Sequence, residues 1–245
     1  MNLLAALALT FALGTHAIKG VALAVPNLRD LDTLGVSWYY NWGQCGDDPR
    51  CVNMAYSMQL PISCPKYLLV GNEPNARPPY GSPVSPKEAA SRVIAIERKC
   101  PETIQVAGNV STDDWGNGSG YTWIASFLKE YHAQSGKPYS QAIGVHCYTL
   151  HDSRYCISNL QQLRGLYNGE MWLTEFGVFS GDVNEFKSLL SFVSHTFNRY
   201  SPYTNSQRPC GGSFQGWAID DRVKLVDECM GQLTPIGKVF AEWNR

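Results

Sequence analysis

Tyr67-Leu68-Leu69-Val70-Gly71-Asn72-Glu73-Pro74 is an apolar run that delivers a glutamate at the point where the run stops. The same arrangement recurs in Met171-Trp172-Leu173-Thr174-Glu175-Phe176-Gly177. A short continuous apolar run bounded by Gly or Pro is typical of a buried strand in a parallel sheet. Both stretches therefore predict a carboxylate at the carboxyl end of a buried strand.

Strand-like and helix-like segments alternate on either side of these two stretches, an order that predicts a parallel α/β fold. We expect eight strands, at residues 19–24, 36–41, 51–56, 67–71, 104–109, 142–148, 171–176 and 214–219. Eight strands with interleaved helices in 245 residues predict a compact (β/α)8 TIM barrel. Active sites of this fold lie at the carboxyl ends of the strands, where Glu73 would end strand four and Glu175 strand seven.

The expected helices are clear only in the second half of the chain. Ser85-Pro86-Lys87-Glu88 has the pattern of a capping box with Pro at the first helical position. Four stripes of apolar side chains at helical spacing are expected to pack on the barrel: Ala89, Val93, Ile96 and Cys100; Trp123, Phe127 and Tyr131; Leu160, Leu163 and Tyr167; and Phe186, Leu189, Leu190, Val193 and Phe197.

The connections in the first half are short and rich in Gly, Pro and Asp, which predicts shortened helices there. Residues 42–50 and 58–66 are both of this kind. Residues 74–86 contain five prolines directly after Glu73. Such a stiff loop suits the wall of a cleft.

Two carboxylates on one barrel rim are the groups that glycoside hydrolysis requires. One acid protonates the leaving oxygen, and the other carboxylate attacks the anomeric carbon or activates water. The acid must be protonated at working pH, and the negative charge of Glu175 would help by raising the pKa of Glu73. The alternative for either residue is an ordinary exposed loop carboxylate.

Four segments in order along the chain resemble glycoside hydrolase family 128, whose characterised members are mainly endo-β-1,3-glucanases. The resemblance implies a retaining double displacement with Glu73 as general acid/base and Glu175 as nucleophile. It spans nearly all of the expected mature chain and rests on Val36-Ser37-Trp38-Tyr39-Tyr40-Asn41-Trp42, Leu68-Leu69-Val70-Gly71-Asn72-Glu73-Pro74, Val145-His146-Cys147-Tyr148 and Trp172-Leu173-Thr174-Glu175-Phe176-Gly177.

The resemblance also implies substrate-binding residues around the two glutamates. Asn72 would hydrogen-bond the 2-hydroxyl of the sugar under attack. His146 and Tyr148 share one face of strand six by period-two alternation, and one or both would orient Glu175. Trp217 resembles the aromatic platform beside the nucleophile, although barrel packing is the alternative for this side chain.

The end of strand two supplies three further candidates for substrate contact, Tyr39, Asn41 and Trp42. Trp38 and Tyr40 have the opposite parity from Asn41 along the strand. We therefore expect Trp38 and Tyr40 in the barrel core.

Composition narrows the partners of the chain. It is 44% hydrophobic and 17% charged with a net charge of -1, so it has no basic stripe to favour nucleic acid. Seven Trp and thirteen Tyr supply rings that either fill the core or stack on sugars. The resemblance to family 128 implies that the substrate is a polysaccharide, β-1,3-glucan, and we expect a monomer that needs neither a cofactor nor a metal.

Residues 3–13 form an apolar run that is too short to span a membrane and suits a secretory signal. We expect cleavage after Ala17, which leaves residues 18–245 as one catalytic domain with no later membrane span, either free outside the cell or associated with the cell wall. Cleavage after Ala24 fits the small-x-small rule better but would remove strand one.

Eight cysteines lie outside this signal, an even number that predicts disulfides in a secreted chain. A zinc site is the alternative, but no CxxC pair or cluster of His residues supports it. The connectivity is formally open, and nearest-neighbour pairing would join Cys45 with Cys51, Cys64 with Cys100, Cys147 with Cys156, and Cys210 with Cys229. Asn117 and Asn109 begin candidate glycosylation sequons.

Three other functions compete with a secreted endo-β-1,3-glucanase. A hydrolase of another β-glucan, mixed-linkage glucan for example, or one acting in exo mode, would keep the same chemistry. A carbohydrate-binding protein would use the barrel without catalysis. A disulfide-rich wall protein would leave the paired glutamates unexplained.

Overall fold

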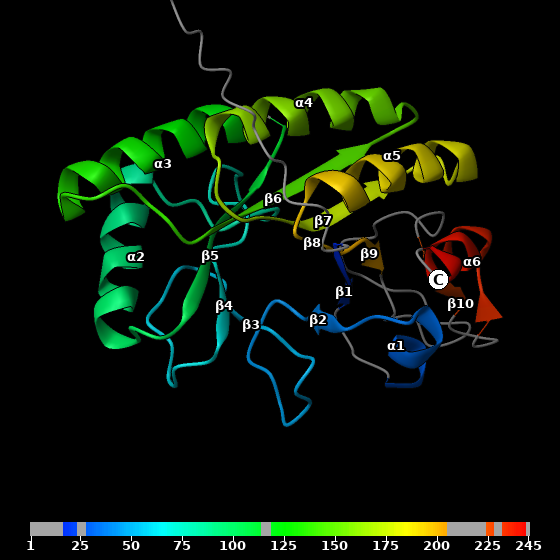
Figure 1. Ribbon diagram of the computed structural model, residues 1–245, viewed down its shortest axis with the longest axis horizontal. Coiled ribbons are helices and arrows are strands. Elements are labelled where there is room, and N and C mark those ends of the chain that lie inside the picture. Colours follow the sequence, from blue (N-terminus) through cyan, green and yellow to red (C-terminus); the bar gives the residue numbers. More distant parts are fainter. Residues whose placement is uncertain (1–16, 24–27, 114–118, 205–223, 228–231, 244–245) are drawn as a thin grey trace, which may run out of the picture.

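Eight parallel strands form a nearly closed (β/α)8 barrel in the computed structural model, with helices around its outside (Figure 1). The structure describes residues 17–23, 28–113, 119–204, 224–227 and 232–243. The barrel strands are β1 (Ile18–Leu23), β2 (Trp38–Tyr40), β3 (Asn53–Ala55), β4 (Tyr67–Val70), β5 (Ile104–Ser111), β6 (Ala142–Thr149), β7 (Met171–Val178) and β8 (Arg199–Tyr200).

Seven of the eight expected strands lie where the sequence predicts them. The position between β7 and β1 is taken by β8, and β9 (Tyr203–Thr204) continues the pairing with β1. The expected strand at residues 214–219 lies outside the described residues. Sequence reasoning missed β8 because its two residues stand in a polar segment with Pro202, which offers no apolar run.

The barrel closes between β2 and β3 at a seam of a single bridge. This bridge pairs Tyr39 with Cys51. The amide of Tyr39 donates to the Arg50 carbonyl over 3.0 Å, and the amide of Val52 donates to the Tyr39 carbonyl over 2.8 Å. A disulfide between Cys45 and Cys51 lies directly at this seam.

The long helices all belong to the second half of the barrel, as predicted. They are α2 (Pro86–Lys99), α3 (Gly120–Ser135), α4 (Ser153–Leu166) and α5 (Val183–Thr196), and their expected apolar stripes are buried. Ser85 caps α2 by accepting from the Glu88 amide over 3.2 Å. The described connections from β2 to β3 and from β3 to β4 contain no helix. The sequence reasoning did not find α1 (Leu28–Leu34), α6 (Pro235–Glu242) or the hairpin of β10 (Val226–Asp227) and β11 (Gln232–Leu233).

Two layers of apolar side chains hold the barrel together. The larger layer packs the outer face of the sheet against the helices. The smaller layer fills the barrel interior with Ala22, Trp38, Tyr40, Val52, Met54, Leu69, Val106, Ala142 and Trp172. Trp172 is fully buried there, and its ring centroid lies 5.2 Å from that of Trp38 and 5.4 Å from that of Tyr67. The interior is therefore a packed core, and polar side chains gather at its carboxyl end.

Three disulfides are present among the described residues. They join Cys45 to Cys51, Cys64 to Cys100 and Cys147 to Cys156, the same pairs that nearest-neighbour pairing gives. Cys210 and Cys229 lie outside the described residues, as does the apolar run at residues 3–13. None of the helices that the structure describes has the length and apolar character needed to span a bilayer.

Candidate active site

Glu73 and Glu175 meet at the carboxyl end of the barrel, where both carboxylates face the same nitrogen of His146. Glu73 follows β4, and Glu175 lies within β7 in register with His146 of β6. His146 Nδ1 is 3.0 Å from Glu73 Oε1 and 3.5 Å from Glu175 Oε2. One oxygen of each carboxylate lies within 4.8 Å of the other. Both glutamates are buried, with 8% and 6% of their surface exposed.

Three donors fix the carboxylate of Glu175. Tyr40 Oη and Trp42 Nε1 donate to Oε1 over 2.7 and 2.8 Å. Tyr148 Oη donates to Oε2 over 2.7 Å. Burial raises the pKa of Tyr40 and of Tyr148 well above the ordinary tyrosine value, and the negative charge of Glu175 raises both further. Both phenols therefore stay neutral hydrogen-bond donors.

Glu73 and His146 each shift the pKa of the other. Burial raises the pKa of Glu73, His146 counteracts this through its hydrogen bond and charge, and Glu175 and Asp113 raise the pKa again. Burial lowers the pKa of His146, but the charge of Glu175 and the hydrogen bond and charge of Glu73 leave it raised. A carboxyl group that keeps its proton at pH values where an ordinary glutamate has lost it is suited to work as an acid.

Left-handed backbone at three non-glycine residues shapes the site. Trp42 has φ +60°, Glu73 has φ +44° and Asn109 has φ +50°. Such conformations each cost on the order of 1–3 kcal/mol and persist only where surrounding contacts enforce them. Here the amide of Glu73 donates to the Asn109 carbonyl over 2.9 Å, which fixes the turn that carries the glutamate.

Asn109 connects the strand ends that carry the two glutamates. Its side-chain nitrogen Nδ2 donates to the Gly71 carbonyl over 3.1 Å, and its Oδ1 accepts from the Thr174 hydroxyl over 2.9 Å. A Cβ atom on Gly144 would lie 2.0 Å from that oxygen, so the close approach requires glycine there. Asn109 is fully buried, and its glycosylation sequon is therefore inaccessible in the folded protein. Asn117 lies outside the described residues.

Most of the other predicted substrate-binding residues lie in this cluster. Asn72 is buried, and among the described residues its Oδ1 has no hydrogen-bond partner. His146, Tyr148 and Trp42 contact the glutamates as described above. The Oδ1 of Asn41 accepts from the Gly43 amide over 3.3 Å and so supports a turn. Trp217 lies outside the described residues.

The structure corrects the sequence interpretation of strand two. Tyr39 is buried in the layer between sheet and helices, away from the glutamates, whereas Tyr40 contacts Glu175. The expectation that Trp38 and Tyr40 lie in the barrel core is confirmed, but the contact between Tyr40 and Glu175 was not predicted. In the structure the inner face carries the aromatic alternation Trp38, Tyr40, Trp42. That period-two aromatic pattern was the signal that could have identified Tyr40.

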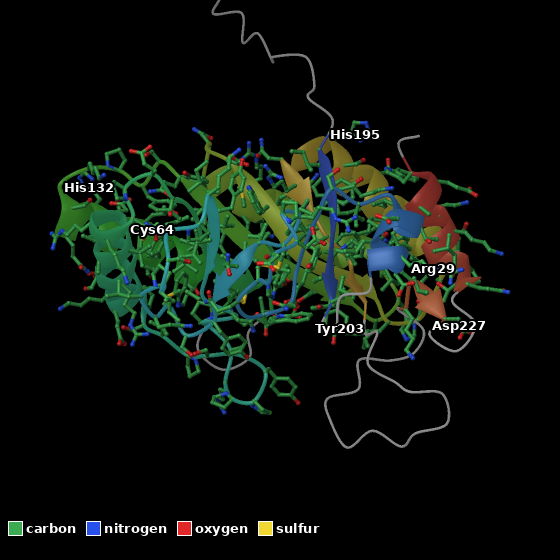
Figure 2. All side chains as sticks on the ribbon, turned by 90° about the horizontal axis from the view of Figure 1, so that it is seen from below. Arg29, Cys64, His132, His195, Tyr203 and Asp227 are labelled. Carbon is green, nitrogen blue, oxygen red and sulfur yellow. A yellow bond between two sulfur atoms is a disulfide. The ribbon has the colours of Figure 1, made fainter. Side chains whose placement is uncertain are left out.

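Tyr203 of β9 was also missed, because the segment around it has no strand pattern. Its ring centroid lies 5.4 Å from that of Trp42 and 6.4 Å from that of Tyr148 (Tyr203 is labelled in Figure 2). Burial, together with the charge of Glu175, raises the pKa of Tyr203 to about 12. Trp42, Tyr148 and Tyr203 thus surround the nucleophile side of the site with aromatic rings.

The spacing of Glu73, His146 and Glu175 would also admit a divalent cation, since each offers one ligand atom within 4.8 Å of the others. The hydrogen bonds described above already use these atoms. The expectation that the site works without a metal stays a prediction.

The chain matches the model of the glycosyl hydrolase catalytic core over residues 24–240. It belongs to that family. No significant match to a curated protein was found.

Solved structures with a similar fold belong to glycoside hydrolase family 128, which confirms the resemblance seen in the sequence motifs. A subgroup IV endo-β-1,3-glucanase from Lentinula edodes superposes with a TM-score of 0.70 at 16% identity, over 91% of this chain and 98% of that one. A subgroup I endo-β-1,3-glucanase from Amycolatopsis mediterranei, in complex with laminaritriose, gives 0.67 at 18% identity over 93% and 99%. A subgroup VII oligosaccharide-binding protein from Trichoderma gamsii gives 0.59 at 14% identity over 92% of each chain.

Proposed function

We propose that the protein is a retaining endo-β-1,3-glucanase in which Glu73 is the general acid/base and Glu175 the nucleophile. The observation that carries this proposal is the pair of buried carboxylates with oxygens within 4.8 Å on the carboxyl ends of β4 and β7. Retaining enzymes hold their carboxyl groups about 5 to 5.5 Å apart, whereas inverting enzymes need about 6.5 to 9.5 Å to admit a water.

The two steps follow from the hydrogen bonds of the site. Glu73 gives its proton to the glycosidic oxygen while Glu175, oriented by Tyr40, Trp42 and Tyr148, bonds to the anomeric carbon. Glu73 then takes a proton from water, which attacks the same carbon and releases Glu175. Asn72, with its unpartnered Oδ1, accepts a hydrogen bond from the 2-hydroxyl.

His146 acts on both glutamates during the reaction. When Glu73 has lost its proton, the nearby Nδ1–H of His146 stabilises the resulting anion. Its position between both carboxylates also limits their mutual repulsion while Glu175 carries its charge.

The fold supports the proposed substrate class, and the disulfides support the proposed setting. The family 128 endo-β-1,3-glucanases share the fold, and one of them was solved with laminaritriose. Three disulfides suit an oxidising compartment. We therefore propose a secreted monomer, made with a signal that ends at Ala17, which acts on β-1,3-glucan without metal or cofactor.

A carbohydrate-binding protein is the second candidate, because the Trichoderma gamsii relative in fold is an oligosaccharide-binding protein. The presence of both buried glutamates, with donors arranged around Glu175, favours catalysis. A pure binding site would have no use for a carboxyl pair that must be desolvated.

Product analysis separates these candidates. The purified protein, beside its Glu175→Gln variant, is incubated with linear β-1,3-glucan, mixed-linkage glucan, cellulose and mannan, and product sizes are followed over time. Short β-1,3-oligomers of mixed length, seen only with the unaltered protein, support the endo-glucanase. Release of one small product from the start indicates exo mode. Binding to β-1,3-glucan without any product leaves the carbohydrate-binding protein.

The pH profile should carry the signature of Glu73. Its raised pKa means that the acid form persists above the ordinary glutamate value of about 4.3 and is lost only as pH rises further. The kcat/KM for a β-1,3-oligosaccharide should therefore fall on the alkaline side of that value. This limb belongs to the coupled Glu73–His146 pair.

Two variants test the assignment of the alkaline limb. Glu73→Gln, assayed with an aryl glycoside whose leaving group needs no proton, should show no such limb. His146→Phe removes the hydrogen bond that lowers the pKa of Glu73 and should move the limb to higher pH. A limb that stays in place in both variants would assign it to another group.

Tyr148→Phe should slow the reaction while leaving the fold intact. The change removes the hydroxyl that donates to Glu175 Oε2 and keeps the ring. Hydrogen bonds to charged groups contribute about 1.5–3 kcal/mol, so we expect kcat to fall about 10- to 100-fold. Steady-state kinetics at the pH optimum measures this, with thermal unfolding as the check on the fold. A kcat within twofold of the unaltered protein would show that this donor does not matter.

A further inference from the structure

Several exposed apolar side chains lie in the segments that follow β4 and the two strands next to it. Seven large hydrophobic side chains are exposed among the described residues. Four of them lie in the segments that follow β4, β5 and β6: Tyr80, Tyr121, Leu150 and Tyr155. Grouped exposed apolar side chains at a cleft mark a binding surface more often than scattered ones do.

One of these side chains is paired with a carboxylate. Tyr155, in the first turn of α4, is 49% exposed, and its hydroxyl donates to Asp113 Oδ1. Asp113 follows β5, and Asn75, two residues beyond Glu73, donates to the Asp113 carbonyl over 3.3 Å. The charge of Asp113 is close enough to raise the pKa of Glu73. The Asp113–Tyr155 pair therefore stands next to the acid.

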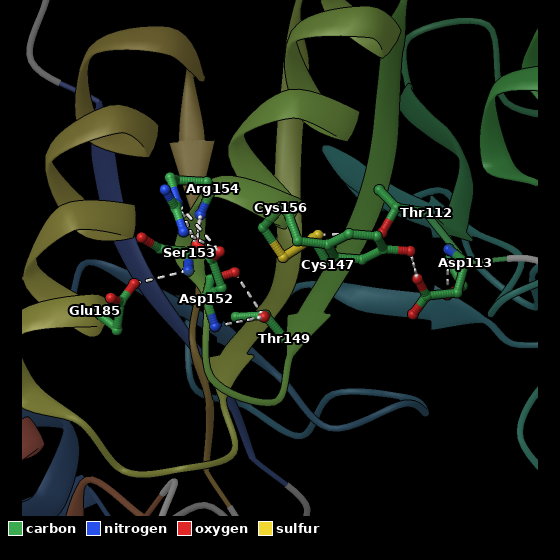
Figure 3. The surroundings of a disulfide bond; sticks show 11 residues. Thr112, Asp113, Cys147, Thr149, Asp152, Ser153, Arg154, Cys156 and Glu185 are labelled. Atoms are coloured by element: carbon green, nitrogen blue, oxygen red, sulfur yellow. Dashed lines mark hydrogen bonds and ion pairs between the residues drawn. A yellow bond between two sulfur atoms is a disulfide. The ribbon is translucent and has the colours of Figure 1, made fainter.

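A disulfide anchors this pair to the catalytic strand. Cys156, the neighbour of Tyr155, bonds to Cys147, and Cys147 lies between His146 and Tyr148 on β6. Figure 3 shows this disulfide with Thr112 and Asp113 beside it. The hydroxyl of Thr112 donates to Cys147 Sγ over 3.1 Å. Both cysteines are fully buried, so the first turn of α4 is held at a fixed place relative to the glutamates.

The positions of the two glutamates place the leaving sugar on the side of the rim that carries Glu73. The glycosidic oxygen lies between the sugar under attack and the leaving sugar, and Glu73 must reach it. The sugar under attack occupies the Glu175 side, among Trp42, Tyr148 and Tyr203. The next sugar must then extend past Glu73, over the ends of β4, β5 and β6.

We propose, on the basis of the proposed function, that Asp113 and Tyr155 form a subsite for the first glucosyl unit of the leaving group. The half-exposed ring of Tyr155 offers an apolar face to the C–H face of the pyranose. The carboxylate of Asp113 has more acceptor sites than its bond to Tyr155 uses and takes hydrogen bonds from sugar hydroxyls. The same subsite binds an acceptor sugar when the glycosyl-enzyme is resolved by a sugar instead of water.

A trapped glycosyl-enzyme isolates this subsite from the rest of the reaction. With 2-deoxy-2-fluoro-β-laminaribiosyl fluoride, the Glu175 carboxylate forms the C–O bond and fluoride leaves, so no leaving sugar is needed. Added laminaribiose then attacks the anomeric carbon, its hydroxyl proton passes to Glu73, and the bond to Glu175 breaks. Mass spectrometry of the protein follows both stages.

Reactivation as a function of laminaribiose concentration is the readout. Tyr155→Ala and Asp113→Ala should each raise the half-maximal concentration by on the order of tenfold, which corresponds to about 1.4 kcal/mol. Tyr155→Phe and Asp113→Asn, which keep the side-chain shapes, should give smaller increases. Ile62→Ala is the matched control, because it truncates an exposed apolar side chain in the connection that leads into the amino end of β4. Its half-maximal laminaribiose concentration should equal that of the unaltered protein.

The outcomes separate the subsite from the proposed function. If the glycosyl-enzyme forms and all four variants are reactivated at the unaltered laminaribiose concentration, the subsite is overturned and the proposed function stands. If the unaltered protein forms no adduct on Glu175, the proposed function fails and the subsite with it. A variant that does not fold, as judged by thermal unfolding, is replaced in the comparison by its conservative partner.

Discussion

Glu175→Gln is expected to lower kcat on β-1,3-glucan by at least about 10⁴-fold, the scale on which enzymes lose rate when a covalent nucleophile is removed. Glutamine keeps the size of the side chain and can still hydrogen-bond Tyr40, Trp42 and Tyr148, so the fold should be unchanged. The measurement is release of reducing ends from the polysaccharide, with thermal unfolding of both proteins beside it.

Azide distinguishes the roles of the two glutamates. In Glu175→Ala, azide should take the place of the missing nucleophile and yield an α-glycosyl azide from an aryl β-glycoside. In Glu73→Ala, azide should attack the glycosyl-enzyme in place of water and yield a β-glycosyl azide. The reverse pattern would exchange the two roles, and loss of only a few-fold in Glu175→Gln would remove this residue from the chemistry.

Trp172→Ala should have the largest effect on stability. The side chain is fully buried in the barrel interior, against Trp38 and Tyr67, and the guanidinium of Arg199 lies 4.6 Å from its ring. Truncating a buried Trp to Ala removes about 3–5 kcal/mol of stability through lost burial and a cavity. For a domain of this size we expect the Tm to fall by about 10 °C.

Denaturant unfolding with the disulfides intact measures this change in the free energy of unfolding. Trp172→Phe is the control, since it keeps an aromatic ring and should lose clearly less stability than the alanine variant. A loss below about 1 kcal/mol in Trp172→Ala would mean that the interior can collapse around the missing ring.

The sequence predicts the fold best where elements are long and strongly patterned. The runs that became β4, β6 and β7 and the stripes of α2 to α5 each bury enough apolar surface to settle their own conformation. By contrast, β8 has two residues, and its place is set by its neighbours β7 and β1 through backbone hydrogen bonds. The side chains of β8 form no pattern that predicts this pairing.

The site was predictable to the extent that it lies at strand ends. Glu73, Glu175, His146 and Tyr148 follow from strand position and motif. The role of Tyr40 does not follow as directly, because Trp38, Tyr39 and Tyr40 are all aromatic and only the alternation that continues to Trp42 marks the inner face.

Tyr203 and Asp113 escaped prediction for a related reason. Each lies outside a clear strand or helix pattern, and each reaches the site only because distant segments close the barrel around it. The left-handed backbone of Asn109 is likewise a result of that closure, since its partners come from β4, β5 and β7.

The seam between β2 and β3 is the junction between barrel strands with the fewest paired strand residues, and three backbone hydrogen bonds cross it. The other neighbouring barrel strands pair through at least two residues, whereas this junction has the Tyr39–Cys51 bridge alone. Local opening begins where few backbone hydrogen bonds must break. Trp42 lies two residues after β2 and donates to Glu175, so opening of the seam would move one of the donors that orient the nucleophile. The Cys45–Cys51 disulfide spans this seam, and the covalent link between the segment after β2 and the segment before β3 restrains the stretch of chain that carries Trp42.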